Sequence, residues 1–207
     1  MFLVLAPNIR RYTASHLTVN PSVLDYVAHL PPTAHAVFCY ENVETVRQVL
    51  VSYLKGSQER NEAVYILSSS RESFDDFLHS SKLYAPFAEQ QIDCIEMSKF
   101  SSRTKGIDYE TAMNLIKSRL DATKRLGFNG LRIFVLANDY LDYATAEGVL
   151  EFEKQLGQNF PIPITAICAY DLAEAGGRWD QVLLDLLKAH GAHVFKGLAG
   201  SDRDGAH

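Results

Sequence analysis

The chain has 207 residues, of which 47% are hydrophobic and 22% are charged, and its formal net charge is −5. This length and composition predict one globular domain with a large core, and the negative charge gives no reason to expect binding to nucleic acid or to an anionic membrane. No apolar run approaches the roughly 20 residues that a membrane-spanning helix needs, and Met1–Leu5 is too short for a signal peptide. We therefore expect a cytoplasmic protein.

The first segment, residues 1–32, is predicted to be an N-terminal extension with one short helix over Ser22–His29. Asn20 is a suitable cap for this helix, Pro21 suits its first turn, and the following proline pair ends it. Residues 33–196 are predicted to form an α/β domain. Residues 197–207 are rich in Gly, Ala and Asp and are predicted to be a mobile tail.

Strand-like and helix-like segments alternate through this domain. The predicted strands are Ala36–Tyr40, Ala63–Ser68, Ile92–Met97, Leu131–Ala137, Ile164–Tyr170 and His193–Phe195. The predicted helices are Val43–Gly56, Arg71–Ser81, Tyr109–Leu126, Ala144–Leu156 and Trp179–His190. Several strands are continuous apolar runs, which is typical of strands covered on both faces. The pattern predicts a three-layer α/β fold with a mostly parallel, doubly wound sheet.

The turn after the first strand is Tyr40-Glu41-Asn42, which contains no glycine and no Lys-Ser/Thr pair. In a nucleotide-binding domain this turn would be a phosphate loop, whose backbone amides wrap the anion. Bulky side chains prevent that wrapping, and Glu41 would repel a phosphate. The turn therefore argues against an ATPase and favours a binding or sensing domain.

Ligands of open parallel sheets bind beyond the carboxyl ends of the strands, so the residues there are candidates for a pocket. The strand ends carry Tyr40–Asn42, Ser68–Arg71, Glu96–Lys99, Asn138–Tyr140 and Tyr170-Asp171, and the ligand-binding candidates among them are Tyr40, Glu41, Asn138, Asp139, Tyr170 and Asp171. Helix capping is an equally ordinary role for an Asn-Asp pair at a strand end. The tyrosines suit a small, weakly polar organic molecule, although core packing explains them about as well.

Catalytic and metal-binding patterns are missing from the sequence. Ser68-Ser69-Ser70 lies in no GxSxG elbow, and the polar loop Ser101–Gly106 could hold an anion or be mobile. His190 and His193 straddle a predicted turn, and His35 has no ligand at a metal-site spacing. Cys39, Cys94 and Cys168 lie in apolar runs and are predicted to be buried, reduced thiols. We expect no enzyme activity, no metal and no cofactor.

Several segments together resemble the MEDS domain, the methanogen/methylotroph DcmR sensory domain. The matching segments are His35–Glu41, Glu44, Leu54, Gly56 with Asn61-Glu62-Ala63, Gly127–Arg132, Phe152-Glu153 with Leu156, and Pro163–Asp171. The resemblance implies a core related to RecA/KaiC-like ATPases without a phosphate loop. It also implies that the domain senses small hydrocarbon-derived organic molecules, with His35, Tyr40, Glu41, Tyr170 and Asp171 as the best-matched positions. Phe134–Asp139 departs from the family pattern.

These observations favour a non-enzymatic sensor that binds a small organic ligand between Tyr40/Glu41 and Tyr170/Asp171. Ligand binding would order the Ser101–Gly106 loop, and the signal would pass to a transcription regulator, another signalling protein or a second copy of the chain. Three alternatives remain: a residual nucleotide binder that uses Asn138/Asp139, a degenerate KaiC-like adaptor that binds only protein, and an uncharacterised enzyme.

Overall fold

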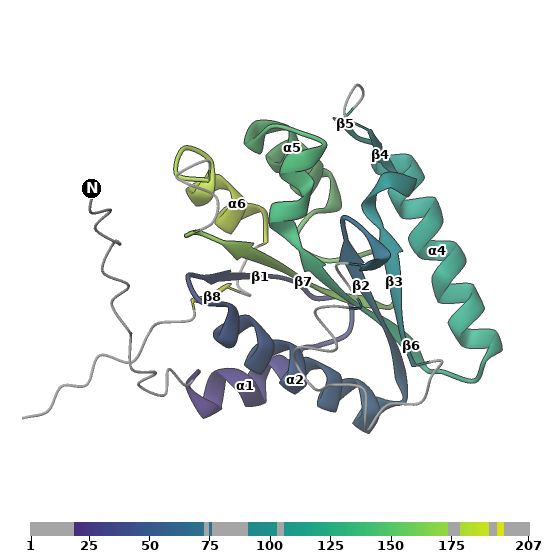
Figure 1. The fold of residues 1–207 in the computed structure, drawn as a ribbon. Helices are drawn as coiled ribbons and strands as arrows, with labels where there is room; N and C mark the ends of the chain where they lie inside the picture. Colours follow the sequence, from purple (N-terminus) through teal and green to yellow (C-terminus); the bar gives the residue numbers. More distant parts are fainter. Residues whose placement is uncertain are drawn as a thin grey trace, which may run out of the picture.

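The computed structural model describes residues 19–72, 75, 91–102, 106–173, 179–190 and 194–196. Its centre is a six-stranded sheet in the spatial order β3-β2-β6-β7-β1-β8, and every pairing is parallel (Figure 1). The strands are β1 (His35–Tyr40), β2 (Glu62–Ser68), β3 (Ile92–Glu96), β6 (Gly130–Leu136), β7 (Ile164–Asp171) and β8 (Val194–Lys196). The predicted α/β class and parallel sheet are confirmed.

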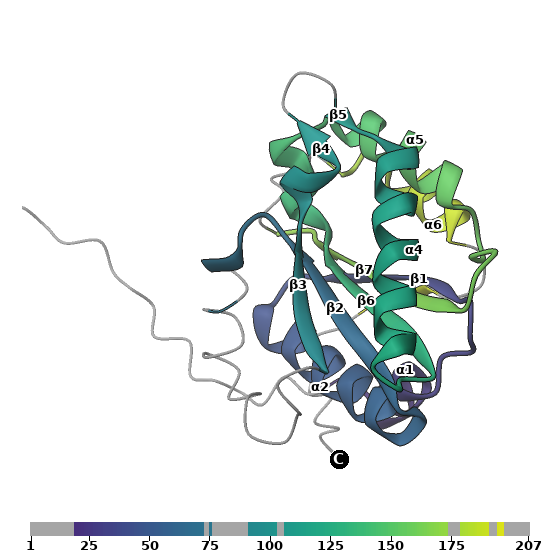
Figure 2. The same ribbon diagram turned by 90° about the vertical axis from the view of Figure 1, so that its right-hand side faces the viewer.

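Helices cover both faces of this sheet. They are α1 (Pro21–Ala28), α2 (Val43–Arg60), α4 (Tyr109–Arg125), α5 (Ala146–Leu156) and α6 (Leu183–Ala189). Figures 1 and 2 show α1 and α2 on one face and α4, α5 and α6 on the other. Two short 3-10 helices, η1 (Met97–Lys99) and η2 (Ala137–Asp142), follow β3 and β6, and β4 (Ser101–Ser102) pairs with β5 (Gly106–Ile107) in a hairpin. Among the described residues, no helix combines the length and apolar character needed to cross a lipid bilayer.

The strands divide their side chains between two cores because successive residues of a strand point to opposite faces. Val37 and Cys39 of β1 belong to the core beneath α4 and α5, whereas Ala36, Phe38 and Tyr40 belong to the core beneath α2. Both faces are buried, which is why β1 reads as a continuous apolar run. Cys39, Cys94 and Cys168 are buried and free, as predicted.

The helix starts follow from local capping. The Asn20 side chain accepts a hydrogen bond from the Ser22 amide at 2.9 Å, and Pro21 is the first residue of α1, as predicted. Thr145 accepts from the Gly148 amide at 3.2 Å, so α5 begins at Ala146, two residues later than predicted.

Two other helix predictions need correction. The helix predicted for Trp179–His190 is shorter, because Trp179 lies in a turn and its indole N–H donates to Asn138 at 3.1 Å. The first predicted helix of the domain continues past Gly56 to Arg60 and ends at Asn61, which adopts a left-handed conformation. Most of the predicted helix Arg71–Ser81 lies outside the described residues, as do residues 1–18 and the tail 197–207.

Gly56 of α2 lies against the backbone of α1. A Cβ atom built on Gly56 would lie 1.9 Å from the carbonyl oxygen of Ala28, which is rigid backbone. Gly56→Ala is therefore expected to lower the free energy of unfolding by about 1–3 kcal/mol, measured by urea denaturation. The matched control is Gly148→Ala on the exposed side of α5, expected to change stability by no more than about 1 kcal/mol. Equal effects of the two substitutions would contradict the close helix contact.

Candidate functional site

Four chemically reactive side chains meet between the sheet and α5. They are His35 at the start of β1, Glu153 of α5, Cys168 of β7 and His190 after the last turn of α6, and we call them the His35 cluster. One ligand atom from each lies within 4.8 Å of the others, and all four residues are fully buried. Parallel pairing places His35 opposite Ala166 and Val37 opposite Cys168, which brings His35 and Cys168 onto the same face of the sheet.

Glu153 is the centre of this cluster. Its Oε2 atom lies 3.1 Å from Nε2 of His35 and 3.3 Å from Nε2 of His190, and its Oε1 accepts a hydrogen bond from the Tyr170 hydroxyl at 2.8 Å. The Cys168 Sγ lies 3.4 Å from Nε2 of His35 and 4.0 Å from Oε2 of Glu153. A buried carboxylate is tolerable only with such partners, so Glu153 organises the polar interior of this core.

Backbone carbonyl groups orient both imidazole rings. Nδ1 of His35 lies 2.7 Å from the carbonyl oxygen of Gly157, and Nδ1 of His190 lies 2.7 Å from that of Leu186. A carbonyl oxygen can only accept a hydrogen bond, so both Nδ1 atoms carry hydrogen. Both Nε2 atoms consequently face the Glu153 carboxylate.

The charges of the cluster shift its pKa values in opposite directions. Burial opposes ionisation of Glu153, but the positive charge of the neighbouring His190, with the contacts of His35, outweighs burial and holds the pKa of Glu153 far below its usual range. Burial likewise opposes the charged form of His190, yet the Glu153 charge outweighs it and raises the pKa of His190. Burial and then the Glu153 charge raise the pKa of the Cys168 thiol well above its ordinary value. The thiol is therefore protonated at neutral pH in the metal-free protein.

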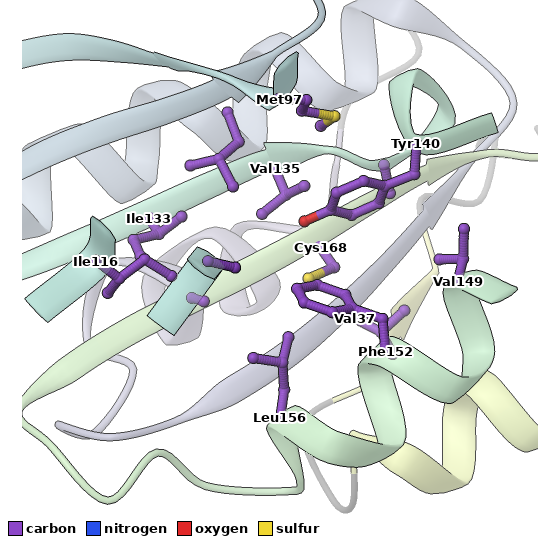
Figure 3. Packing of buried hydrophobic residues seen from close by; sticks show 14 of the residues in the cluster. Val37, Met97, Ile116, Ile133, Val135, Tyr140, Val149, Phe152, Leu156 and Cys168 are labelled. Carbon is purple, nitrogen blue, oxygen red and sulfur yellow. The ribbon is translucent and has the colours of Figure 1, made fainter. Parts of the chain in front are cut away.

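A cavity lined by buried residues lies directly beside the cluster, and His35 and Cys168 form part of its wall. The centre of a water-sized molecule can range over about 20 Å³ inside it. That space is comparable to one or a few water molecules. The other lining residues are Leu67, Phe100, Ala112, Ile116, Ile133, Val135, Tyr140, Phe152, Leu156, Phe160 and Ala166. Figure 3 shows the side chains of Ile116, Ile133, Val135, Tyr140, Phe152, Leu156 and Cys168 converging from the sheet and helices.

The structure brings two of the predicted ligand-binding residues to this site. His35 belongs to the cluster, and Tyr170 donates its hydroxyl hydrogen bond to Glu153. Tyr40 lies on the opposite face of the sheet, in the core beneath α2, where its ring stacks on Phe38 at 5.8 Å. Glu41 is exposed in the turn after β1.

The remaining predicted residues act in turns at the carboxyl edge of the sheet. The Asn138 amide donates to the carbonyl of Asp171 at 2.9 Å and accepts from its N–H at 3.0 Å, so it ties η2 to the end of β7. Asp139 accepts from the Ser69 amide at 2.5 Å and from the Ser68 hydroxyl at 3.2 Å. Burial raises the pKa of Asp139 in spite of these hydrogen bonds. Neither Asn138 nor Asp139 lines the cavity.

Sequence reasoning did not select Glu153, Cys168 or His190 as site residues. In the sequence, the only metal-binding partner considered for His190 is His193, which lies outside the described residues. In the structure, the neighbours of His190 are Glu153 and His35. One signal in the sequence could have indicated Glu153. It occupies the buried stripe of α5, together with Val149 and Leu156, where a carboxylate requires polar partners.

The fold and the cluster define an α/β domain with a buried polar site beside a small cavity. A family model described as MEDS, the methanogen/methylotroph DcmR sensory domain, matches residues 34–191, and the chain belongs to this family of sensory domains. The matched range contains all four residues of the His35 cluster. No curated protein matches the chain.

Proposed function

We propose that this member of the MEDS family is a non-enzymatic sensory domain that binds a small hydrocarbon-derived organic molecule in the cavity beside the His35 cluster. The cavity itself is the supporting observation, because its largely apolar wall includes the residues His35, Tyr140 and Cys168, which carry polar groups. Such a wall suits a molecule with an apolar body and one polar or polarisable group. The small volume favours a ligand of only a few non-hydrogen atoms.

Two elements of the cavity wall suit the transmission of a signal. Phe100 lines the cavity and immediately precedes the β4–β5 hairpin, and its carbonyl oxygen accepts from the Asp108 amide at 2.9 Å. Ala112 and Ile116 line it from α4. A ligand that contacts these residues more favourably in one arrangement of the hairpin and α4 shifts the population toward that arrangement. The output is a protein partner, such as a transcription regulator or signalling protein, or self-association.

We also infer a core related to RecA/KaiC-like ATPases that no longer binds nucleotide. The parallel sheet and the glycine-free turn Tyr40–Asn42 after β1 support this inference. Asp139, the acid that a residual nucleotide site would need for magnesium, already accepts hydrogen bonds from Ser68 and Ser69. That engagement favours the sensor over the nucleotide-binding alternative.

Filling the cavity is expected to abolish ligand binding. A thermal-shift panel of methanol, chloroform, acetone and butanol is applied to the wild-type protein. A cavity ligand present at about 100 times its Kd should raise Tm by about 5–10 °C. Ala112→Val places two more carbon atoms in the cavity and is expected to remove that shift, and Ala166→Val should do the same from the sheet side.

The matched control is Ala122→Val, on the same helix but outside the cavity wall, which should keep the wild-type shift. ATP and ADP with magnesium serve as the comparison ligands. Stabilisation by nucleotide alone, or an equal shift in Ala112→Val and the wild type, would contradict the proposal. If no compound of the panel changes Tm, the alternative of an adaptor that binds only protein is favoured.

A further inference from the structure

We propose that the His35 cluster is a binding site for a divalent transition metal of the Zn²⁺ or Co²⁺ type. The four ligands would be Nε2 of His35, a carboxylate oxygen of Glu153, Sγ of Cys168 and Nε2 of His190. This inference goes beyond the proposed function, because the metal site can exist whether or not the cavity binds an organic ligand.

Three of the separations between the four atoms are already close to those of tetrahedral coordination. Zinc–nitrogen and zinc–oxygen bonds of about 2.0–2.1 Å and a zinc–sulfur bond of about 2.3 Å place neighbouring ligand atoms about 3.3–3.6 Å apart. The Glu153 Oε2 atom lies 3.1 and 3.3 Å from the two histidine Nε2 atoms, and Cys168 Sγ lies 3.4 Å from His35 and 4.0 Å from Glu153. The two remaining separations, from His190 Nε2 to His35 Nε2 and to Cys168 Sγ, are at most 4.8 Å, so the side chains would move together by up to about 1.5 Å to complete the coordination sphere.

The donor set and its surroundings also favour a transition metal. Two imidazoles, one thiol and one carboxylate suit zinc and cobalt rather than magnesium or calcium, which prefer oxygen ligands alone. Histidines that bind metals commonly donate the other ring N–H to a backbone carbonyl, which fixes the tautomer. His35 and His190 both have this arrangement, with Gly157 and Leu186 at 2.7 Å.

An unsatisfied atom points into the site. Nε2 of His190 is buried and makes no hydrogen bond among the described residues, although it lies 3.3 Å from Oε2 of Glu153. The contact is an ion pair when Nε2 carries a hydrogen, and two lone pairs face each other when it does not. A cation between the two groups satisfies both. Metal binding would break the S–H bond of Cys168 and leave the electron pair on sulfur as the ligand, with the proton released to solvent. A hydrogen on Nε2 of either histidine would be released to solvent in the same way, because the metal takes the nitrogen lone pair.

Cobalt titration of the full-length protein tests the site. Protein stripped with a chelator and dialysed is titrated with Co²⁺, with the expectation of about one ion per chain, tetrahedral visible absorption and a thiolate-to-cobalt band in the near ultraviolet. Zn²⁺ should displace the cobalt and raise Tm. Cys168→Ser and His190→Ala should weaken binding by at least about 100-fold, more than loss of an outer-shell partner.

Cys94→Ser is the matched control, since Cys94 is also buried and free but lies on β3, and it should bind Co²⁺ like the wild type. Circular dichroism checks that each variant is folded. If Cys168→Ser or His190→Ala fails to fold, the test rests on the wild-type protein, through its cobalt spectrum and its Tm with and without Zn²⁺. An absent thiolate band, an unchanged Tm, or binding lost equally in Cys94→Ser would overturn the metal site. The organic-ligand panel is repeated on the metal-free protein, so that binding of an organic molecule in the cavity is tested separately from metal binding.

Discussion

Replacement of Glu153 by alanine is expected to lower the free energy of unfolding by about 3–5 kcal/mol, measured by urea denaturation of chelator-treated protein. The substitution removes the carboxylate that faces His35 and His190 and accepts the Tyr170 hydrogen bond, all without access to water. Truncation therefore removes the hydrogen-bond acceptor of the buried Tyr170 hydroxyl and the negative charge beside both histidines, and it leaves a small void.

The control for this prediction is Glu151→Ala, on the same helix. Glu151 is 66% exposed and pairs with Lys154 at 2.7 Å, a surface ion pair that contributes little. Its loss should change stability by less than about 1 kcal/mol. If Glu153→Ala were no more destabilising than Glu151→Ala, the buried cluster could not have the arrangement described above.

The second large effect is expected at Arg132 of β6. Its guanidinium is fully buried and donates to Glu62 at 2.6 Å, to the Tyr53 carbonyl at 3.0 Å and to the Ala28 carbonyl at 2.9 Å. It also lies 4.8 Å from the centre of the Tyr53 ring. These contacts fasten α1 and α2 to the sheet. Arg132→Met should lower the free energy of unfolding by about 3–5 kcal/mol, because Glu62 and both carbonyls lose their donor.

Two further substitutions separate charge from geometry at this position. Arg132→Lys keeps the charge but loses the planar arrangement of N–H donors. Its free energy of unfolding should therefore lie between that of the wild type and that of Arg132→Met. Arg125→Met, at the exposed end of α4, should change stability by about 0.5 kcal/mol or less. A wild-type stability for Arg132→Met would show that the three contacts do not stabilise the fold.

The sheet was predictable because its strands are covered on both faces. β1, β2 and β7 are six, seven and eight residues long with largely apolar sequences, and each predicted range differs from the observed one by a single residue at one end. The helix at Trp179 was less predictable. Its apolar spacing is helical, but the side-chain contact of Trp179 with Asn138, far apart in sequence, stabilises a turn instead.

The candidate site was harder to predict because its residues share no local pattern. His35, Glu153, Cys168 and His190 come from four elements and meet only through the order of the strands and the packing of α5 and α6 on them. Ligands of open parallel sheets usually bind beyond the carboxyl ends of the strands, so the sequence predicted a site there. In the structure, Asn138 and Asp139 at this edge take part in turn hydrogen bonds. A buried face of the sheet, not its edge, holds the reactive side chains.

The most direct test of the sensory site is methyl NMR of protein labelled at Ile, Leu and Val, titrated with the member of the organic panel that raises Tm most. The cavity wall contains the methyl groups of Leu67, Ile116, Ile133, Val135 and Leu156. The core on the other face of the sheet provides internal controls in Val46, Val49, Leu50 and Leu54. The proposal predicts that the largest shift changes fall on the first group and saturate with the ligand. Changes centred on the second group, or on surface methyls only, would contradict a ligand site in the cavity beside the His35 cluster.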